Sequence, residues 1–242
     1  SRALEEKLMI HNIPYKIYGG QNFYQRKEIK DILAYLKTID NGLDGQAVKR
    51  IINVPKRGIG NTTIDRLQEY ADFNDITFWE ALVNAKDIDT IKNAALSKLE
   101  PFVDLIGRLR AKEEFMSLKE LAEAVIEDTG YIESLSQNET VEEVEARREN
   151  LDEFINKVVS YEESCKESGE EPTLSGLLEE VALIADIDNL DESEPHVMLM
   201  TLHSAKGLEF PIVYMTGMED GLFPSYMTIV SDDSTEIEEE RR

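Results

Sequence analysis

A long helical stretch, bracketed by short strand patterns, most constrains how this chain can fold. Over residues 46–185, roughly 140 positions, apolar side chains recur every three to four residues and no strand pattern interrupts them. Residues 13–18 alternate as a short strand, and 197–202 and 212–216 are apolar runs typical of strands buried on both faces. We therefore predict a mainly α protein in which a helical insertion divides a small α/β unit.

The pattern also predicts where the elements and domains begin and end. We expect residues 1–43 and 191–242 to form the α/β unit and residues 44–190 to form the all-helical insertion. The front contains a helix over 1–10 and an amphipathic helix over 25–39 whose apolar face is Ile29, Ile32, Leu33, Leu36 and Ile39. The insertion is expected to contain helices over 46–54, 61–73, 78–83, 91–109, 118–126, 141–159 and 174–184. Pro101 predicts a break or kink, residues 165–172 predict a mobile loop, and both ends of the chain fall inside helical patterns, as expected for a fragment.

Composition narrows the classes of partner. The chain has 26 Lys and Arg against 50 Asp and Glu, a net charge of −24, which excludes a surface uniformly attractive to nucleic acid. A local basic site remains possible because charges beyond about 10 Å are screened. The one cysteine excludes an internal disulfide, and no apolar run approaches the roughly 20 residues of a membrane span. We expect a cytoplasmic protein with no membrane partner.

A basic island lies inside the acidic insertion. Residues 46–66 contain five basic side chains (Lys49, Arg50, Lys56, Arg57 and Arg66) against the single acid Asp65. Two predicted helices there flank a Gly-Ile-Gly turn, a helix-hairpin-helix pattern. Both glycines permit positive φ and close approach of backbone N–H groups, and the following helix N-terminus favours an anion. The candidate contacts to a phosphodiester backbone are Lys56, Arg57, Gly58, Ile59, Gly60, Asn61, Thr62 and Thr63. A plain helical turn is the alternative.

Three segments resemble one known family. Thr201-Leu202-His203-Ser204-Ala205-Lys206-Gly207-Leu208-Glu209-Phe210, continued by residues 217–224, resembles motif V of the UvrD/PcrA/Rep family of superfamily 1 DNA helicases. Residues 18–31 resemble motif IVa of that family, and residues 51–60 resemble the duplex-contacting turn of its 2B subdomain. The resemblance implies that 1–43 and 191–242 form a partial RecA-like 2A subdomain and that 44–190 form the helical 2B insertion.

The resemblance also implies roles for single residues. Thr201, His203 and Lys206 would contact single-stranded DNA, while Gly207 and Glu209 would bind ATP, with Glu209 on the ribose. Ser225 stands where some relatives have a DNA-contacting histidine, so this chain departs from the family pattern at that position. The full enzyme would use ATP and Mg²⁺, move 3′ to 5′ on single-stranded DNA and contact duplex DNA through 2B. The fragment itself is expected to be a monomer.

The sequence contains no Gly-x-x-x-x-Gly-Lys-[Ser/Thr] phosphate loop and no Cys/His metal spacing. Residues 238–242 resemble the start of motif VI without its arginine finger. We therefore expect no catalytic residue, no metal site and no ATP turnover in this chain alone. Two alternatives stay open: a stand-alone duplex-binding module with no ATPase partner, and a nuclease-linked relative of the same superfamily.

Overall fold

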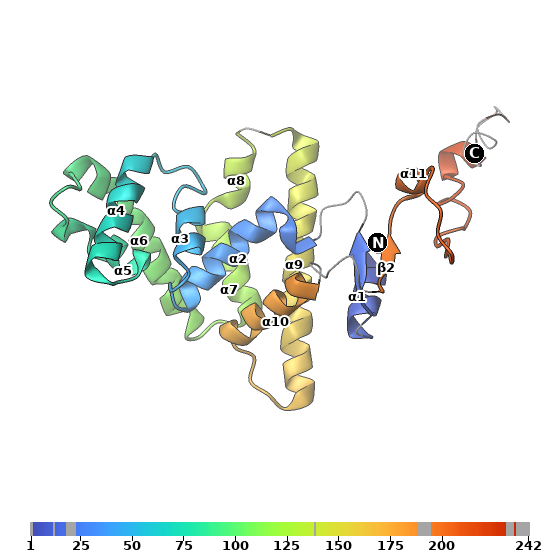
Figure 1. Ribbon diagram of the computed structural model, residues 1–242, viewed down its shortest axis with the longest axis horizontal. Coiled ribbons are helices and arrows are strands. Elements are labelled where there is room, and N and C mark those ends of the chain that lie inside the picture. The colour runs from blue at the N-terminus through green and yellow to red at the C-terminus, as the bar shows by residue number, and fades with distance from the viewer. Residues whose placement is uncertain are drawn as a thin grey trace. The chain divides into compact units, whose positions relative to one another are not determined.

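The computed structural model describes residues 2–11, 13–17, 23–137, 139–187, 195–230 and 235. The chain divides into two compact units, residues 1–199 and 200–242. Helices dominate the described part, which confirms the prediction of a mainly α protein (Figure 1). The predicted features over 18–22, 191–194 and 238–242 lie outside the described residues. None of the described helices is long and apolar enough to cross a membrane.

The helices of the first unit follow the predicted order. They are α1 (Arg2–Ile10), α2 (Lys27–Asp40), α3 (Gly45–Ile51), α4 (Asn61–Asn74), α5 (Phe78–Val83), α6 (Asn93–Glu113), α7 (Leu118–Asp128), α8 (Tyr131–Leu135), α9 (Val141–Ser168) and α10 (Leu174–Ile187). Single 3₁₀ turns at Phe23–Gln25 and Ala85–Asp87 precede α2 and α6. Each predicted helix is present, and most boundaries differ by one to four residues.

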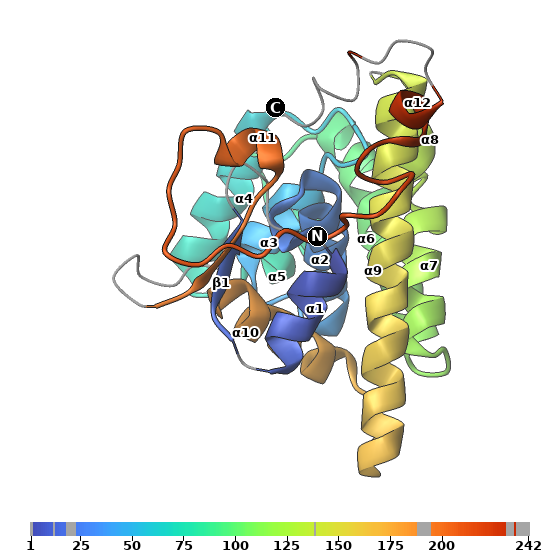
Figure 2. The same cartoon turned by 90° about the vertical axis from the view of Figure 1, so that its right-hand side faces the viewer.

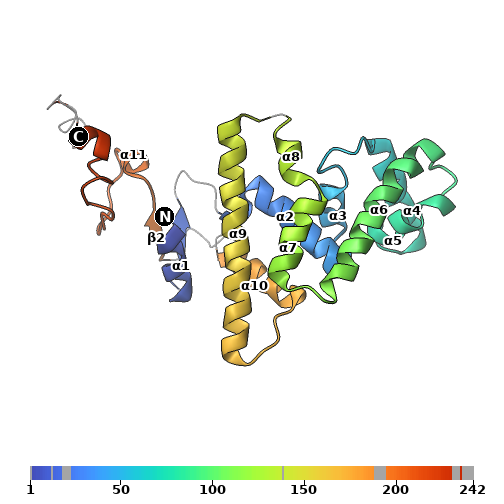
Figure 3. The same ribbon diagram turned by 180° about the vertical axis from the view of Figure 1, so that it is seen from behind.

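Helix α2 is the centre of the helical bundle. All five residues of its predicted apolar face are buried, and so is Tyr35, which is 0% exposed. The helix packs against α3, α6, α7, α9 and α10, and Figure 3, the view from behind, shows α7 and α9 in front of it. A helix buried on nearly every side must be apolar or internally paired all round. Because α2 is shared by so many neighbours, the bundle has one continuous core.

The break after α2 is set by one glycine. Gly42 has φ +68°, and a Cβ there would lie 2.9 Å from the Trp79 ring and 2.8 Å from Arg110. Arg110 stacks 4.7 Å from the Trp79 ring and donates to the carbonyls of Thr38 and Ile39 at 2.7 and 3.0 Å. The last turn of α2 is therefore capped by a cation from α6, which also favours the helix C-terminus electrostatically.

Two local predictions within the bundle need correction. Helix α6 does not break at Pro101, one of the two outcomes predicted there, because one lost N–H bond is outweighed by burial of Leu99, Phe102 and Ile106 along its inner face. Helix α9 does not end near 159 but continues to Ser168, with Cys165 buried inside it. The predicted loop over 165–172 therefore begins only at Gly169, whose φ of +76° ends the helix.

The front and back of the chain meet in a parallel ladder. Strands β1 (Tyr15–Ile17) and β2 (Val197–Leu199) pair with Tyr15 opposite Val197 and Ile17 opposite Leu199. Parallel strands need a long crossover, and the helical bundle is that crossover here. Viewed from the side, β1 lies beside α1 in Figure 2.

Of the two apolar runs predicted as strands at the back, only the first forms one. Strand β2 covers Val197–Leu199 of the predicted 197–202 and is only partly buried, and Leu202 begins the short helix α11 (Leu202–Ala205). Residues 212–216 carry no ladder, and Ile212, Val213 and Tyr214 are 73%, 65% and 86% exposed. A strand buried on both faces requires neighbouring strands and covering helices, and the described residues supply neither to this run. The second unit also contains α12 (Tyr226–Ile229).

Candidate nucleic-acid interface

The Gly-Ile-Gly turn lies between α3 and α4, and the side chain of Asn53 bonds its main chain from inside. Asn53 accepts the N–H of Ile59 at 3.1 Å and that of Arg57 at 3.4 Å, and its amide donates to the Ile59 carbonyl at 2.6 Å. Ile59 itself is 5% exposed and anchors the middle of the turn in the core. The two glycines on either side of it are exposed.

Arg57 points into the protein and not toward solvent. Its guanidinium donates at 2.9, 3.3 and 3.2 Å to the carbonyls of Ile51, Ile52 and Pro55. It also donates to the Tyr35 hydroxyl at 2.8 Å and lies 4.9 Å from the centroid of the Phe102 ring. Tyr35 in turn donates to the Val54 carbonyl, and burial raises the pKa of this hydroxyl while Arg57 opposes that rise. Arg57 thus satisfies the open carbonyls at the end of α3.

Most cations of the basic island make contacts inside the protein. Lys49 lies 5.1 Å from the Phe78 ring, Arg50 pairs with buried Asp31 at 2.7 Å, and Arg66 donates to the Thr90 carbonyl at 2.7 Å. With Arg57 engaged as well, Lys56 is the member of the island whose exposed ammonium has no partner among the described residues.

A second cation reaches the turn from another helix. Lys98 of α6 is exposed and donates to the Gly58 carbonyl at 2.9 Å, across 40 positions of sequence. No local pattern could assign it to the turn, because the contact depends on how α6 packs. Asn53 left a weaker signal, as a polar residue at an otherwise apolar helix end.

Helix α4 begins at the turn with uncapped N–H groups. Gly60 is its N-cap and has no side chain to accept a bond, so the N–H groups of Asn61 and Thr62 have no acceptor within the described residues. The N–H of Thr63 is turned back to the Gly60 carbonyl at 2.9 Å. Gly58 has φ +70°, but Gly60 has φ −78° and open space where a Cβ would stand. Positive φ therefore requires glycine only at Gly58.

The motif V-like residues belong to the second unit. Thr201 caps α11: its hydroxyl accepts the Ser204 N–H at 3.1 Å and lies 2.9 Å from the Ser204 hydroxyl. Lys206 and Glu209 are exposed, and Gly207 has φ +82°, which ends the short helix. His203 is part of α11, but its side chain is outside the described part. Ser225 caps α12 by accepting the Thr228 N–H at 3.3 Å.

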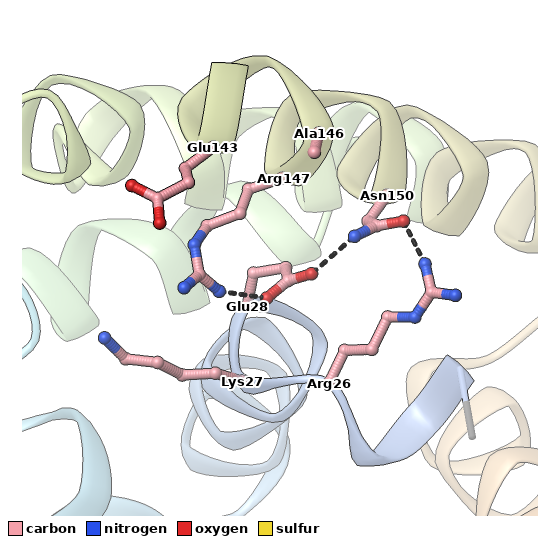
Figure 4. Close-up of a pocket in the computed structure, with 7 residues that line it drawn as sticks. All are labelled: Arg26, Lys27, Glu28, Glu143, Ala146, Arg147 and Asn150. Atoms are coloured by element: carbon pink, nitrogen blue, oxygen red, sulfur yellow. Dashed lines mark hydrogen bonds and ion pairs between the residues drawn. The ribbon is translucent and has the colours of Figure 1, made fainter. Parts of the chain in front are cut away.

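An open pocket of about 400 Å³ lies elsewhere, between α9 and the start of α2 (Figure 4). Glu28 is at its floor, bonded to Arg147 and Asn150, each at 2.6 Å, and Arg26 bonds to Asn150. Its polar groups bond to one another across two helices. This arrangement indicates a packing contact between α2 and α9, and none of the predicted site residues lines it.

A family model described as the UvrD-like helicase C-terminal domain matches residues 1–242. The chain belongs to this family. ATP-dependent DNA helicase PcrA of Staphylococcus epidermidis is 45% identical over 242 residues, and PcrA of Staphylococcus aureus is 46% identical over 242 residues. Each match covers 100% of this chain and 32% of the relative, so the chain spans about a third of the length of these curated relatives. The resemblance to UvrD/PcrA-type superfamily 1 helicases is thereby confirmed for this UvrD-like C-terminal domain.

Proposed function

We propose that this chain is the 2A and 2B portion of an ATP-dependent DNA helicase that moves 3′ to 5′ along single-stranded DNA. The family match over residues 1–242 supports the helicase assignment. The parallel ladder between β1 and β2 supports one α/β unit interrupted by a helical insertion. In this proposal 1–43 and 191–242 belong to 2A and 44–190 to 2B. A stand-alone duplex-binding module would have no need of that ladder.

The observation that carries the proposal is the start of α4. Two uncapped N–H groups, those of Asn61 and Thr62, occupy a helix N-terminus, where the partial positive charge favours a phosphate. Lys56 precedes that terminus in the same turn, and Lys98 is bonded to the turn itself. These groups contact backbone and carry no means of reading bases, so binding is independent of sequence.

The expected strength of this contact is modest. The chain's net charge of −24 repels DNA at long range, and only a few phosphates reach the turn. We therefore expect affinity in the non-specific range, about 10⁻⁴ to 10⁻⁶ M. Arg57 enters the proposal as an internal residue, since both terminal nitrogens of its guanidinium bond to groups inside the protein.

For the second unit we propose the roles that the motif V resemblance implies. Lys206 and His203, with Thr201 holding the short helix, contact single-stranded DNA; Gly207 and Glu209 contribute to ATP binding in the complete enzyme. The exposure of Lys206 and Glu209 leaves both available to a ligand. ATP and Mg²⁺ act in the complete enzyme, and this chain alone is monomeric, cytoplasmic and without turnover.

Fluorescence anisotropy with two duplexes of unrelated sequence tests the proposal. Lys56→Ala should weaken binding to both duplexes equally. The matched control is Lys119→Ala, which removes the same charge from α7, where Lys119 pairs with Glu123 on an exposed face. Equal losses from Lys56→Ala and Lys119→Ala would mean that only net charge matters, and the turn would not be the contact. Circular dichroism verifies that each variant is folded.

A further inference from the structure

Three side chains hold the Gly-Ile-Gly turn from behind. Asn53 bonds both the N–H and the carbonyl of Ile59, at 3.1 and 2.6 Å. Arg57 ties the end of α3 to Tyr35 of α2, at 2.8 Å from its hydroxyl. Tyr35 is 0% exposed and also donates to the Val54 carbonyl. We refer to Tyr35, Asn53 and Arg57 as the turn clamp.

We propose that the turn clamp is a set of positioning residues for duplex binding, and that Arg57 acts through the turn and not by touching phosphate. This inference rests on the proposed function and names the residues that hold the DNA-binding turn in place. Each donor of Arg57 that bonds a carbonyl or a hydroxyl is withdrawn from DNA, and its face lies 4.9 Å from the Phe102 ring. Its charge therefore serves the turn.

The clamp matters because the contact is small. If the turn had to become ordered when DNA binds, the lost conformational entropy would reduce the binding affinity. A turn that is already fixed avoids this cost. Ile59 is the one buried residue of the segment from Lys56 to Gly60, and both of its main-chain bonds go to Asn53. Loosening the clamp would therefore displace the N–H groups at the start of α4.

Tyr35→Phe separates a positioning role from a direct contact. The side chain is wholly buried, so removal of its hydroxyl cannot delete a DNA contact. Loss of the hydroxyl's bonds to Arg57 and to the Val54 carbonyl should weaken duplex binding about three- to tenfold. The matched control is Tyr131→Phe, which deletes another buried hydroxyl. That hydroxyl donates to Asp31 of α2, the helix that also carries Tyr35, at 2.7 Å but makes no bond to the turn. Tyr131→Phe should bind as the parent does.

Arg57→Lys provides a second test, because it keeps the positive charge but removes the guanidinium. A lysine cannot reproduce three carbonyl bonds and a stack on Phe102, so the clamp predicts weakened binding. An arginine that served DNA only as a point charge beside a phosphate would be replaced by lysine with little loss. Parent-like affinity of both Tyr35→Phe and Arg57→Lys would overturn the inference.

Hydrogen exchange at the Ile59 amide supplies a readout that is independent of DNA. The amide is bonded to Asn53, so Tyr35→Phe and Arg57→Lys should speed its exchange several-fold, while Tyr131→Phe should not. Unchanged exchange in both clamp variants would overturn the inference even where binding falls. A parent chain that binds no duplex would overturn the proposed function and the positioning role together; faster exchange would then still identify the clamp as a structural support.

Discussion

Arg147 of α9 donates to the carboxylate of Glu28 in α2 at 2.6 Å, although 119 positions of sequence separate the two residues. Glu28 is 3% exposed, and its other oxygen accepts from Asn150 at 2.6 Å. One turn further along α2, buried Asp31 is bonded by Arg50 and Tyr131, each at 2.7 Å. The acidic residues of the motif IVa-like helix therefore join α2 to α3, α8 and α9.

Arg147→Ala should destabilise the bundle by about 2 to 3 kcal/mol, because it leaves a buried carboxylate with only an amide partner. The Arg147 side chain is itself about a quarter exposed, so the loss should fall below that of a fully buried pair. Urea unfolding followed by circular dichroism gives the change in the free energy of unfolding.

The neighbouring residue supplies the control for that experiment. Arg148 pairs with Glu145 at 3.7 Å, and both side chains are more than half exposed. Arg148→Ala removes the same side chain from the same helix and should cost no more than about 0.5 kcal/mol. Similar losses at both positions would show that Glu28 does not depend on its ion pair.

The helices were predictable because each carries its own signal. The apolar spacing of Ile29, Ile32 and Leu36 identified α2, and burial of all three confirms it. Predictions failed where the outcome depends on distant contacts. Pro101 predicted a break or kink from its own residue type, yet α6 continues as helix past it, with Phe102 and Ile106 packed in the core. Acidic residues around Cys165 suggested a loop, but the buried face of α9 continues past them.

The site was predicted at the level of the segment but not of the side chain. Sequence placed a glycine turn before α4, and the structure has it there. The sequence could not show that Arg57 bonds to main-chain carbonyls and lies over the ring of Phe102, 45 positions away. Nor could it show that Lys98 bonds to the turn. The strand predicted over 212–216 is absent for a related reason, since a strand forms only where neighbouring strands pair with it.

Gly60→Ser should stabilise the chain and weaken its binding to DNA. A serine at the N-cap of α4 accepts an N–H bond that Gly60 cannot, which adds a few tenths of a kcal/mol, and it occupies the groups that a phosphate would contact. Gly60→Ala is the control: its Cβ meets open space, its φ of −78° suits alanine, and it brings no acceptor. Urea unfolding and anisotropy on both variants are the measurements. If Gly60→Ser binds as tightly as Gly60→Ala, the N–H groups take no part.

Exchange of backbone amides should be slower over residues 47–184 than over 197–216. The helices around α2 enclose a continuous core, whereas 212–214 are largely exposed and carry no ladder. Native-state hydrogen exchange read by mass spectrometry compares the two segments in one sample. Equal or reversed protection would show that the second unit is held by contacts that this account does not include.

This chain alone should release no phosphate from ATP above background. It contains no phosphate loop, and the ribose contact proposed for the exposed Glu209 could not replace the groups that stabilise a transferring phosphoryl. Glu209→Ala should leave the assay unchanged. Steady-state release that exceeds background and disappears in Glu209→Ala would contradict the assignment of ATP turnover to the complete enzyme.

The salt dependence of duplex binding tests the central claim most directly. Each phosphate neutralised adds about −0.9 to the slope of log K against log salt, so the few contacts at the turn predict roughly −2 to −4 for the parent chain. Lys56→Ala combined with Lys98→Ala should make that slope shallower by about 1 to 2 and lower the affinity equally for unrelated duplexes. Lys119→Ala should leave the slope as it is. A folded double variant with the parent's slope and affinity would contradict the claim that this turn contacts the DNA backbone.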